Sequence, residues 1–316
     1  MKHNSGYNKN RVKNIKRAKT MILFIIVAVF VIGGSTLMSV KFSESKQAVQ
    51  ALDVNNETSA KASEINQTTS QNQDTSDKIN YLPLGQDPVA DDVASMEKYL
   101  VQQEKGQMPD GADGKKVVYL TFDDGPSETV TPKILDVLKD ENVKATFFIV
   151  GHALDSSDAN KNLVKREANE GNAIGNHTYS HDYKYLFPGS TVNINNFTSD
   201  IEKTNQSLKN VLGSDFSTRA IKIPGGHMSW KGMQPLDDWL KSKDYHYIDW
   251  NVLSRDAEGK TKNADELLEQ VKETTKGRQK AIILMHDTYE KEETVKALPQ
   301  VIEYLKAQGY EFRTMK

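Results

Sequence analysis

The 316-residue chain contains no cysteine, so no disulfide bond stabilises it. If the protein is exported, this absence fits the surface of a Gram-positive bacterium better than a small secreted animal domain, which usually needs such bridges. Neither sign of charge is in large excess: the formal net charge is −2, which gives no reason to expect a nucleic-acid partner. No internal repeat is evident, and the length suits one large domain or two small ones.

The first 40 residues differ from the rest of the chain in charge. Residues 1–19 carry seven Lys or Arg and no acid, and subtracting these seven charges from the net −2 leaves −9 for the remainder. Residues 21–40 carry no charge and are rich in Ile, Val, Leu and Phe, which matches the thickness of a hydrocarbon core. No convincing cleavage site follows. We therefore expect a cytoplasmic basic tail (1–19), a retained single-pass membrane anchor (20–40) and an extracellular catalytic domain.

The next segment is poor in groups that build a core. From 41 to 78 it consists mainly of Ser, Thr, Asn, Gln and Ala, with no aromatic residue after Phe42, which predicts disorder. The region up to 114 is ambiguous, because residues 91–103 fit one amphipathic helix. We expect 41–114 to form an extracellular linker, partly disordered, and 115–316 to form the catalytic domain.

From Lys115 onward, apolar or β-branched runs alternate with helical periods. A helix is predicted after Thr131-Pro132, where a capping residue precedes a proline in the first turn. This alternation implies an α/β fold with a mostly parallel sheet, although periodicity alone does not distinguish an open sheet from a barrel. The predicted strands are 116–122, 144–150, 172–176, 219–223, 245–250, 280–286 and 310–314.

Polar clusters follow five of the seven predicted strands. In α/β barrels the active site gathers at the carboxyl ends of the strands, so we expect these clusters to share one site. They are Asp123-Asp124, His177 with His181, the stretch from Lys222 to Gly226, Asp256, and His286-Asp287.

Two adjacent carboxylates and two histidines four residues apart suit a divalent metal site. Catalytic zinc takes three protein ligands from His and Asp or Glu and keeps a fourth position for water. One aspartate can therefore bind the ion while the other handles protons. His177 and His181 would lie on one face if their segment is helical. Alone, Asp123-Asp124-Gly125 is commonly just a turn. Two histidines and a carboxylate also occur in non-haem iron oxygenases, but those usually have an all-β scaffold.

Five ordered motifs resemble the polysaccharide deacetylase family (carbohydrate esterase family 4), and within it the membrane-anchored peptidoglycan N-acetylglucosamine deacetylases of Gram-positive bacteria. Any one motif alone is weak, but all five in order are specific, and the resemblance covers roughly 115–316. It implies a distorted (β/α) barrel of about seven strands. The motifs are Thr121-Phe122-Asp123-Asp124-Gly125, His177-Thr178-Tyr179-Ser180-His181, Pro224-Gly225-Gly226, Asp249-Trp250 with Asp256, and Leu284-Met285-His286-Asp287.

The resemblance also implies an activity and a role for each motif residue. The activity is metal-dependent hydrolysis of N-acetyl groups on the N-acetylglucosamine residues of a cell-wall glycan, with release of acetate. The implied partners are that glycan and the membrane, and the implied ion is Zn²⁺. The implied roles are metal binding by Asp124, His177 and His181, general base for Asp123, oxyanion contact for Gly225, general acid for His286, and orientation of that acid by Asp256.

Two positions depart from the family pattern. Lys222 stands where the family usually has Arg; it keeps the positive charge but loses the planar guanidinium. If it contacts Asp123 it still favours the ionised carboxylate, whereas Arg219 falls on the opposite pleat of the strand. Ala257 stands where the family usually has a Trp of the acetyl pocket.

These departures keep alternatives open. One is an O-acetyl esterase on xylan or another polysaccharide, or a chitin-oligosaccharide deacetylase. A second is a glycan-binding surface protein whose catalysis has decayed. Outside the motifs, His152 follows the second predicted strand and is a candidate for lining the cleft. Tyr183, Tyr185 and Trp230 fall in predicted loops, where an aromatic ring either stacks on a sugar or simply packs.

Overall fold

A computed structural model of the chain describes residues 79–316. Its main element is a curled sheet in which seven strands run in the order β6-β5-β4-β3-β2-β8-β7, with every pair parallel. The short β9 (Glu311–Phe312) pairs with the start of β2. The strands of the path are β2 (Val117–Asp123), β3 (Thr146–Ile149), β4 (Ala173–Asn176), β5 (Ala220–Ile221), β6 (His246–Tyr247), β7 (Val252–Leu253) and β8 (Lys280–His286).

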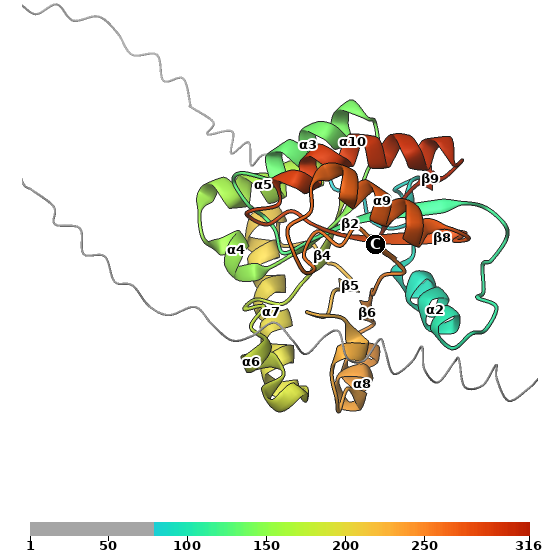
Figure 1. Cartoon of the computed structure of the whole chain (residues 1–316). Coiled ribbons are helices and arrows are strands. Elements are labelled where there is room, and N and C mark those ends of the chain that lie inside the picture. The colour runs from blue at the N-terminus through green and yellow to red at the C-terminus, as the bar shows by residue number, and fades with distance from the viewer. Residues whose placement is uncertain (1–78) are drawn as a thin grey trace, which may run out of the picture. The chain divides into compact units, whose positions relative to one another are not determined.

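Helices cover the outside of this sheet, and each contacts the next in the order α9-α10-α3-α5-α7-α8 (Figure 1). This is the order of the strands that precede them, as expected when each strand is followed by a helix packed beside it. The curled parallel sheet with its outer layer of helices fits a distorted (β/α) barrel. The helices are α3 (Thr131–Asp140), α5 (Asp158–Asn169), α7 (Ile194–Leu212), α8 (Gln234–Ser242), α9 (Ala264–Thr275) and α10 (Glu292–Ala307). The connections hold α4 (Gly151–Asp155), α6 (Tyr183–Leu186) and the 3₁₀ turns η1 (Pro188–Ser190) and η2 (His227–Ser229).

The strands alternate their side chains between two apolar clusters. On β2, Val118, Leu120 and Phe122 pack toward the helices, whereas Val117 and Tyr119 pack inside the curl of the sheet. Because side chains alternate along a strand, the inner row continues from residue 119 to residue 123. On the neighbouring β8, the same alternation from Ile282 leads to residue 286. The fold therefore brings Asp123 and His286, which are paired in the ladder, to the same inner end of the barrel.

The structured domain begins before Lys115, which corrects the predicted boundary of the linker. β1 (Ala90–Asp91) pairs with β10 (Thr314–Met315), and α2 (Val93–Glu104) follows it. Val93 and Met96 are buried in the inner apolar cluster, so α2 packs against the inner side of the sheet. The amphipathic helix expected at 91–103 is present. Its apolar stripe was readable, but its partners lie more than a hundred residues away, so the sequence did not indicate that it belongs to this domain.

Two of the predicted strands also need correction. The expected strand 245–250 is reduced to β6, and 310–314 is divided between β9 and β10, off the seven-strand path. The seventh member of the path is β7, which was not predicted. A two-residue strand leaves no periodicity to detect, because its ladder partner, not its composition, holds it extended.

The tail predicted at 1–19, the anchor predicted at 20–40 and the disorder predicted for 41–78 all lie outside the described residues. Within residues 79–316, no helix has the length and apolar character needed to cross a membrane.

Candidate active site

Two adjacent aspartates at the end of β2 point in different directions. Asp123 continues the inner row and is buried. Asp124 has a φ of 69°, a left-handed conformation that turns the chain out of the strand and is costly for a residue other than glycine. Gly125 then lies tightly against the carboxylate of Asp287, where any side chain would collide. This turn presents two carboxylates to the same space from different angles.

The two histidines that follow β4 come together in a loop, not on a helix, which corrects the conditional expectation of a shared helical face. Thr178 and His181 both have positive φ values, 65° and 49°. The Asp200 carboxylate holds the loop by accepting hydrogen bonds from the Ser180 backbone N–H and hydroxyl, at 2.7 and 2.6 Å. The two imidazole rings end 4.6 Å apart between centroids.

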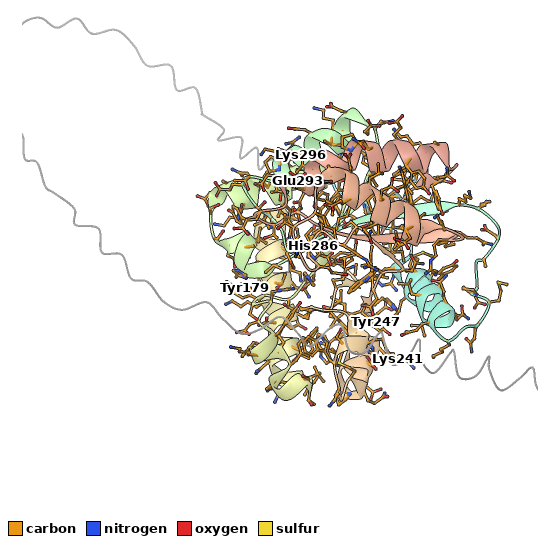
Figure 2. All side chains as sticks on the ribbon, viewed as in Figure 1. Tyr179, Lys241, Tyr247, His286, Glu293 and Lys296 are labelled. Atoms are coloured by element: carbon orange, nitrogen blue, oxygen red, sulfur yellow. The ribbon has the colours of Figure 1, made fainter. Side chains whose placement is uncertain are left out.

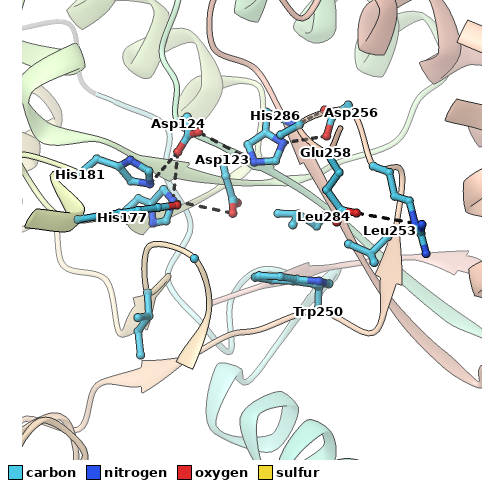
Figure 3. A pocket seen from close by; sticks show the side chains of 15 residues that line it. Asp123, Asp124, His177, His181, Trp250, Leu253, Asp256, Glu258, Leu284 and His286 are labelled. Carbon is cyan, nitrogen blue, oxygen red and sulfur yellow. Dashed lines mark hydrogen bonds and ion pairs between the residues drawn. The ribbon is translucent and has the colours of Figure 1, made fainter. Parts of the chain in front are cut away.

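Asp124, His177 and His181 form a donor set that fits a divalent cation. Nε2 of His177 and Nε2 of His181 lie 3.2 and 3.1 Å from Oδ1 of Asp124, and the three ligand atoms all lie within 4.8 Å of one another (Figure 3). Nδ1 of His177 lies 2.9 Å from the Lys222 carbonyl, so in the neutral tautomer that nitrogen carries the hydrogen and Nε2 presents a lone pair.

The protonation of the other two residues fits the same interpretation. Burial and the neighbouring His177 lower the pKa of His181 to about 4, which leaves its ring neutral. Burial opposes the ionisation of Asp124, but the surrounding histidines, among them protonated His286, outweigh it and lower the pKa of the carboxyl. Oδ1 of Asp124 is buried and has no hydrogen-bond donor among the described residues. Lone pairs that face one another at about 3 Å repel unless a cation lies between them.

Beside this donor set, Asp123 faces the buried side chain of Lys222. Nζ of Lys222 lies 3.6 Å from Oδ2 of Asp123 and is fully buried, packed over the rings of Phe148 and Trp250. Burial raises the pKa of Asp123, while the charge of Lys222 opposes that rise. Lys222 therefore stands where the expected ion pair requires it, although at 3.6 Å it makes no hydrogen bond. Arg219 is engaged elsewhere, with Asp92 and Asp244.

On the other side of Asp124, His286 is paired with Asp256. Nδ1 of His286 lies 2.8 Å from Oδ1 of Asp256, whose other oxygen accepts hydrogen bonds from the His286 backbone and from Thr294. Burial alone would lower the pKa of His286, but the hydrogen bond and charge of Asp256 outweigh it and raise that pKa to about 9. In Figure 2, His286 lies in the middle of the view, with the α10 residues Glu293 and Lys296 above it. Nε2 of His286 lies 4.0 Å from Oδ2 of Asp124, so a protonated imidazole faces the donor set.

The comparisons with known proteins agree with this geometry. The family model described as polysaccharide deacetylase matches residues 110–235. A peptidoglycan-N-acetylglucosamine deacetylase of Bacillus cereus is 34% identical over 76% of this chain and 84% of its own length. The chain belongs to the polysaccharide deacetylase family.

Two further relatives support this assignment. A peptidoglycan-N-acetylglucosamine deacetylase of Listeria monocytogenes is 34% identical over 72% of this chain, which spans 44% of that longer protein. The solved structure of a CE4 esterase of Streptococcus mutans superposes with a TM-score of 0.64 at 34% identity, covering 72% of this chain and 92% of that one. The polysaccharide deacetylase described here is thus an enzyme, a hydrolase that acts on amide bonds, as predicted.

A cavity of about 190 Å³ in this deacetylase opens onto Asp123, His286 and the donor set, and its apolar wall was not predicted. Trp250, Leu253 and Leu284 line it beside Asp123 and His286 (Figure 3). Leu284 was detectable, because it lies on the inner row of β8 between residues 282 and 286. Leu253 was not, since its two-residue strand carries no pattern.

Three other positions named from the sequence also lie on this cavity. Ala257 lines it, so the residue that departs from the family pattern is part of the wall, and the indole of Trp250 lines it as well. Gly225 also lines it, with a φ of 76° and, among the described residues, no acceptor for its N–H. A Cβ on Gly225 would lie 3.2 Å from the ring of Trp230, so a side chain there would press against that ring.

Proposed function

We propose that this polysaccharide deacetylase hydrolyses the N-acetyl group of N-acetylglucosamine residues in a cell-wall glycan, peptidoglycan, and releases acetate. The observation that carries the proposal is the arrangement around Asp124. A donor set for a divalent ion lies between a buried carboxylate on one side and a histidine held protonated on the other. Amide hydrolysis needs a base for water and an acid for the leaving nitrogen, and these two groups meet that need.

The ion that we propose is Zn²⁺, held by Asp124, His177 and His181. Two imidazoles and one carboxylate form a donor set typical of catalytic zinc. When bound, such an ion supplies a Lewis acid that polarises the acetyl carbonyl and lowers the pKa of water.

Asp123 acts as the general base. Its carboxylate lies 4.0 Å from Nε2 of His177, so it borders the donor set without belonging to it. It accepts a proton from the attacking water, whose oxygen forms the new bond to the acetyl carbon. Burial raises the pKa of Asp123, and the cation of Lys222 opposes that rise and so favours the ionised form that a base requires.

His286 completes the reaction as the general acid. With its pKa raised to about 9, the ring is protonated at neutral pH and can give its Nε2 proton to the sugar nitrogen as the carbon–nitrogen bond breaks. The N–H of Gly225 is available to donate to the oxyanion of the tetrahedral intermediate. Trp250, Leu253 and Leu284 provide an apolar wall for the acetyl methyl group. The products are acetate and a glucosamine amine.

The test is acetate release by the purified full-length chain from peptidoglycan and from N-acetylglucosamine oligomers, before and after chelation. We expect release that chelation abolishes and Zn²⁺ restores, and that Asp123→Asn abolishes as well. An O-acetylated xylan measured alongside separates the alternative activity. Faster acetate release from the ester polymer, with none from the amide, would show that the proposal names the wrong bond. Glycan binding without any turnover would identify a decayed enzyme.

We further propose that the enzyme acts on the outer face of the cell membrane, held there by residues 20–40. The proposal rests on the basic and apolar pattern of the sequence alone. Fractionation of cells that express the full chain should place it in the membrane, and protease added to intact cells should degrade the catalytic domain. Recovery of the protein in the soluble fraction would exclude the anchor.

A further inference from the structure

The turn at residues 224–227, which follows β5, carries the oxyanion contact proposed above. Hydrogen bonds within it hold part of its backbone: the Gly226 N–H donates to the Ile223 carbonyl at 2.8 Å, and the Gly226 carbonyl accepts from the Ser229 N–H at 3.2 Å. Gly225 is exposed and lines the cavity, and among the described residues its N–H is the one N–H of this turn without an acceptor. The turn therefore leaves free only the donor that the proposed chemistry uses.

The two glycines of this turn do not fix its conformation by themselves. Gly225 and Gly226 have consecutive positive φ values, 76° and 83°. Glycine reaches this region at little cost, but it reaches others as readily, so an unsupported pair of glycines would sample several orientations of its peptide planes. A donor stabilises a developing oxyanion best when its direction is fixed before the reaction. Contacts from outside the two glycines must therefore set the direction of this N–H.

The indole of Trp230 supplies the contact that bears most directly on this direction. Its Nε1 donates to the Pro224 carbonyl at 2.7 Å. That carbonyl belongs to the same planar peptide group as the Gly225 N–H, and in a trans peptide the two point to opposite sides. Holding the carbonyl toward the indole therefore aims the N–H away from it.

Trp230 is itself held in place. Its ring lies parallel over the buried ring of Phe187, with centroids 4.0 Å apart, and meets the ring of Tyr183 edge-on at 5.3 Å. Rotating the indole would lose both ring contacts, so its N–H is a rigid donor. Of the two roles that the sequence left open for this loop aromatic, the structure shows packing, with the polar end of the ring bound to the turn.

Two further side chains hold the turn at other points. The Ser229 hydroxyl donates to the Gly225 carbonyl at 2.6 Å. The His227 N–H donates to the carboxylate of Asp249, at 3.2 Å from each oxygen. Asp249 also attracts Lys222, so its hydrogen bond and its charge have to be tested separately.

We propose that Trp230 is a positioning residue, which aims the Gly225 N–H at the oxyanion by holding the Pro224 carbonyl. Ser229 and Asp249 support the same turn at its next carbonyl and its last N–H. The inference rests on the proposed function and deepens it, because it names what orients a donor in the catalytic step. Losing this orientation matters only when negative charge develops on the acetyl oxygen, so kcat should fall while KM stays near its parent value.

The test measures acetate release from a penta-N-acetylglucosamine oligomer by the full-length chain loaded with Zn²⁺. Trp230→Phe keeps a ring over Phe187 but removes the indole N–H, and it should lower kcat about 10- to 100-fold, less than outright removal of an oxyanion donor. KM should change by less than about twofold. The matched control is Trp239→Phe, because Trp239 is also half-buried but its ring pairs with Tyr245. Its kcat should stay at the parent value.

Asp249 provides an independent pair of variants. Asp249→Ala removes the acceptor of the His227 N–H, whereas Asp249→Asn keeps an acceptor oxygen and loses only the charge that attracts Lys222. Asp249→Ala should lower kcat about tenfold, and Asp249→Asn should restore most of it. If Asp249→Asn is as slow as Asp249→Ala, the effect runs through Lys222 and the support assigned to Asp249 is wrong.

A second substrate, 4-nitrophenyl acetate, separates this inference from the function on which it rests. If the parent cleaves the ester but not the oligomer, and Trp230→Phe lowers kcat for the ester, the proposed function fails and the positioning role stands. If the parent deacetylates the oligomer and Trp230→Phe leaves kcat unchanged, raises KM alone or matches Trp239→Phe, the positioning role is refuted and the activity is untouched. Should Trp230→Phe not fold, benzothienylalanine at position 230 replaces the N–H by sulfur with the ring shape kept, and the same outcomes decide.

Discussion

The buried pair of Lys222 and Asp123 should dominate both the stability and the pH dependence of the site. Nζ of Lys222 lies 3.6 Å from Oδ2 of Asp123, and both side chains are almost fully buried. At an effective dielectric constant of about 20, two unit charges at this separation attract by about 5 kcal/mol. Asp249 also attracts Lys222, and the carboxyl of Asp123 can take up a proton when its partner is lost. We therefore expect a measured coupling of about 2–4 kcal/mol.

The assay is a double-mutant cycle. Urea unfolding of the chelated full-length chain is followed for the parent, Lys222→Met, Asp123→Asn and the double variant. Each single change leaves one buried charge without its partner and should lower the free energy of unfolding by about 3–5 kcal/mol. The double variant should be more stable than the sum of the single losses predicts. Lys222→Arg, which keeps the charge, is the control.

The Lys222 variants should also differ in the pH dependence of their reaction rate. Burial already raises the pKa of Asp123, and removing Lys222 raises it further, so the base becomes ionised only at higher pH. The acid limb of the pH–rate profile should therefore move to higher pH in Lys222→Met and stay near its parent position in Lys222→Arg. A coupling energy below about 0.5 kcal/mol, together with an unmoved acid limb, would refute the reasoning.

Three other changes test the remaining groups. Asp256→Asn removes the partner that raises the pKa of His286 to about 9. Because burial alone lowers that pKa, the loss of activity at alkaline pH should move to lower pH. A pH–rate profile that does not move would contradict the assignment of His286 as the acid. His177→Ala should weaken Zn²⁺ binding, measured by calorimetry, at least about 100-fold. The control is His246→Ala, which should leave Zn²⁺ binding unchanged because the ring of His246 pairs with Glu97. Equal effects of the two variants would place the ion elsewhere. Glu167 is fully buried, neither of its carboxylate oxygens has a partner among the described residues, and burial raises its pKa well above the ordinary value. In the folded protein Glu167 thus holds a proton that the unfolded chain releases, so the parent loses stability as pH rises above about 4.5. The gain in Tm from Glu167→Gln should therefore grow between pH 5 and pH 8. A gain in Tm that does not depend on pH would contradict this.

Much of the site was predictable because its chemistry is local in the sequence. Asp123-Asp124 ends an apolar strand, and the alternation along β2 and β8 determines which residues point inward. The two histidines are four residues apart, so any tight turn keeps them close enough to share an ion, although the loop they occupy is not a helix. The order of the five motifs was enough to indicate the family. Each of these features depends on neighbouring residues or on spacing along one strand.

The remaining features depend on contacts between distant parts of the chain. β7 extends only because β8 pairs with it, and through it Leu253 reaches the cavity. α2 belongs to the domain because its apolar stripe meets residues from several strands inside the curled sheet. The distance from Lys222 to Asp123 is set by the way β5 and β2 curl around the interior.

The sequence alone determined which residue types are available, the period of each strand and helix, and the face that each presents. Only the tertiary structure decided which of those faces meet, how far Lys222 stands from Asp123, and that the indole of Trp230 binds the turn of Gly225. The physical reason is that propensity and periodicity act over a few residues. The walls of a cavity are assembled from segments that approach one another only when the whole sheet curls and buries its core.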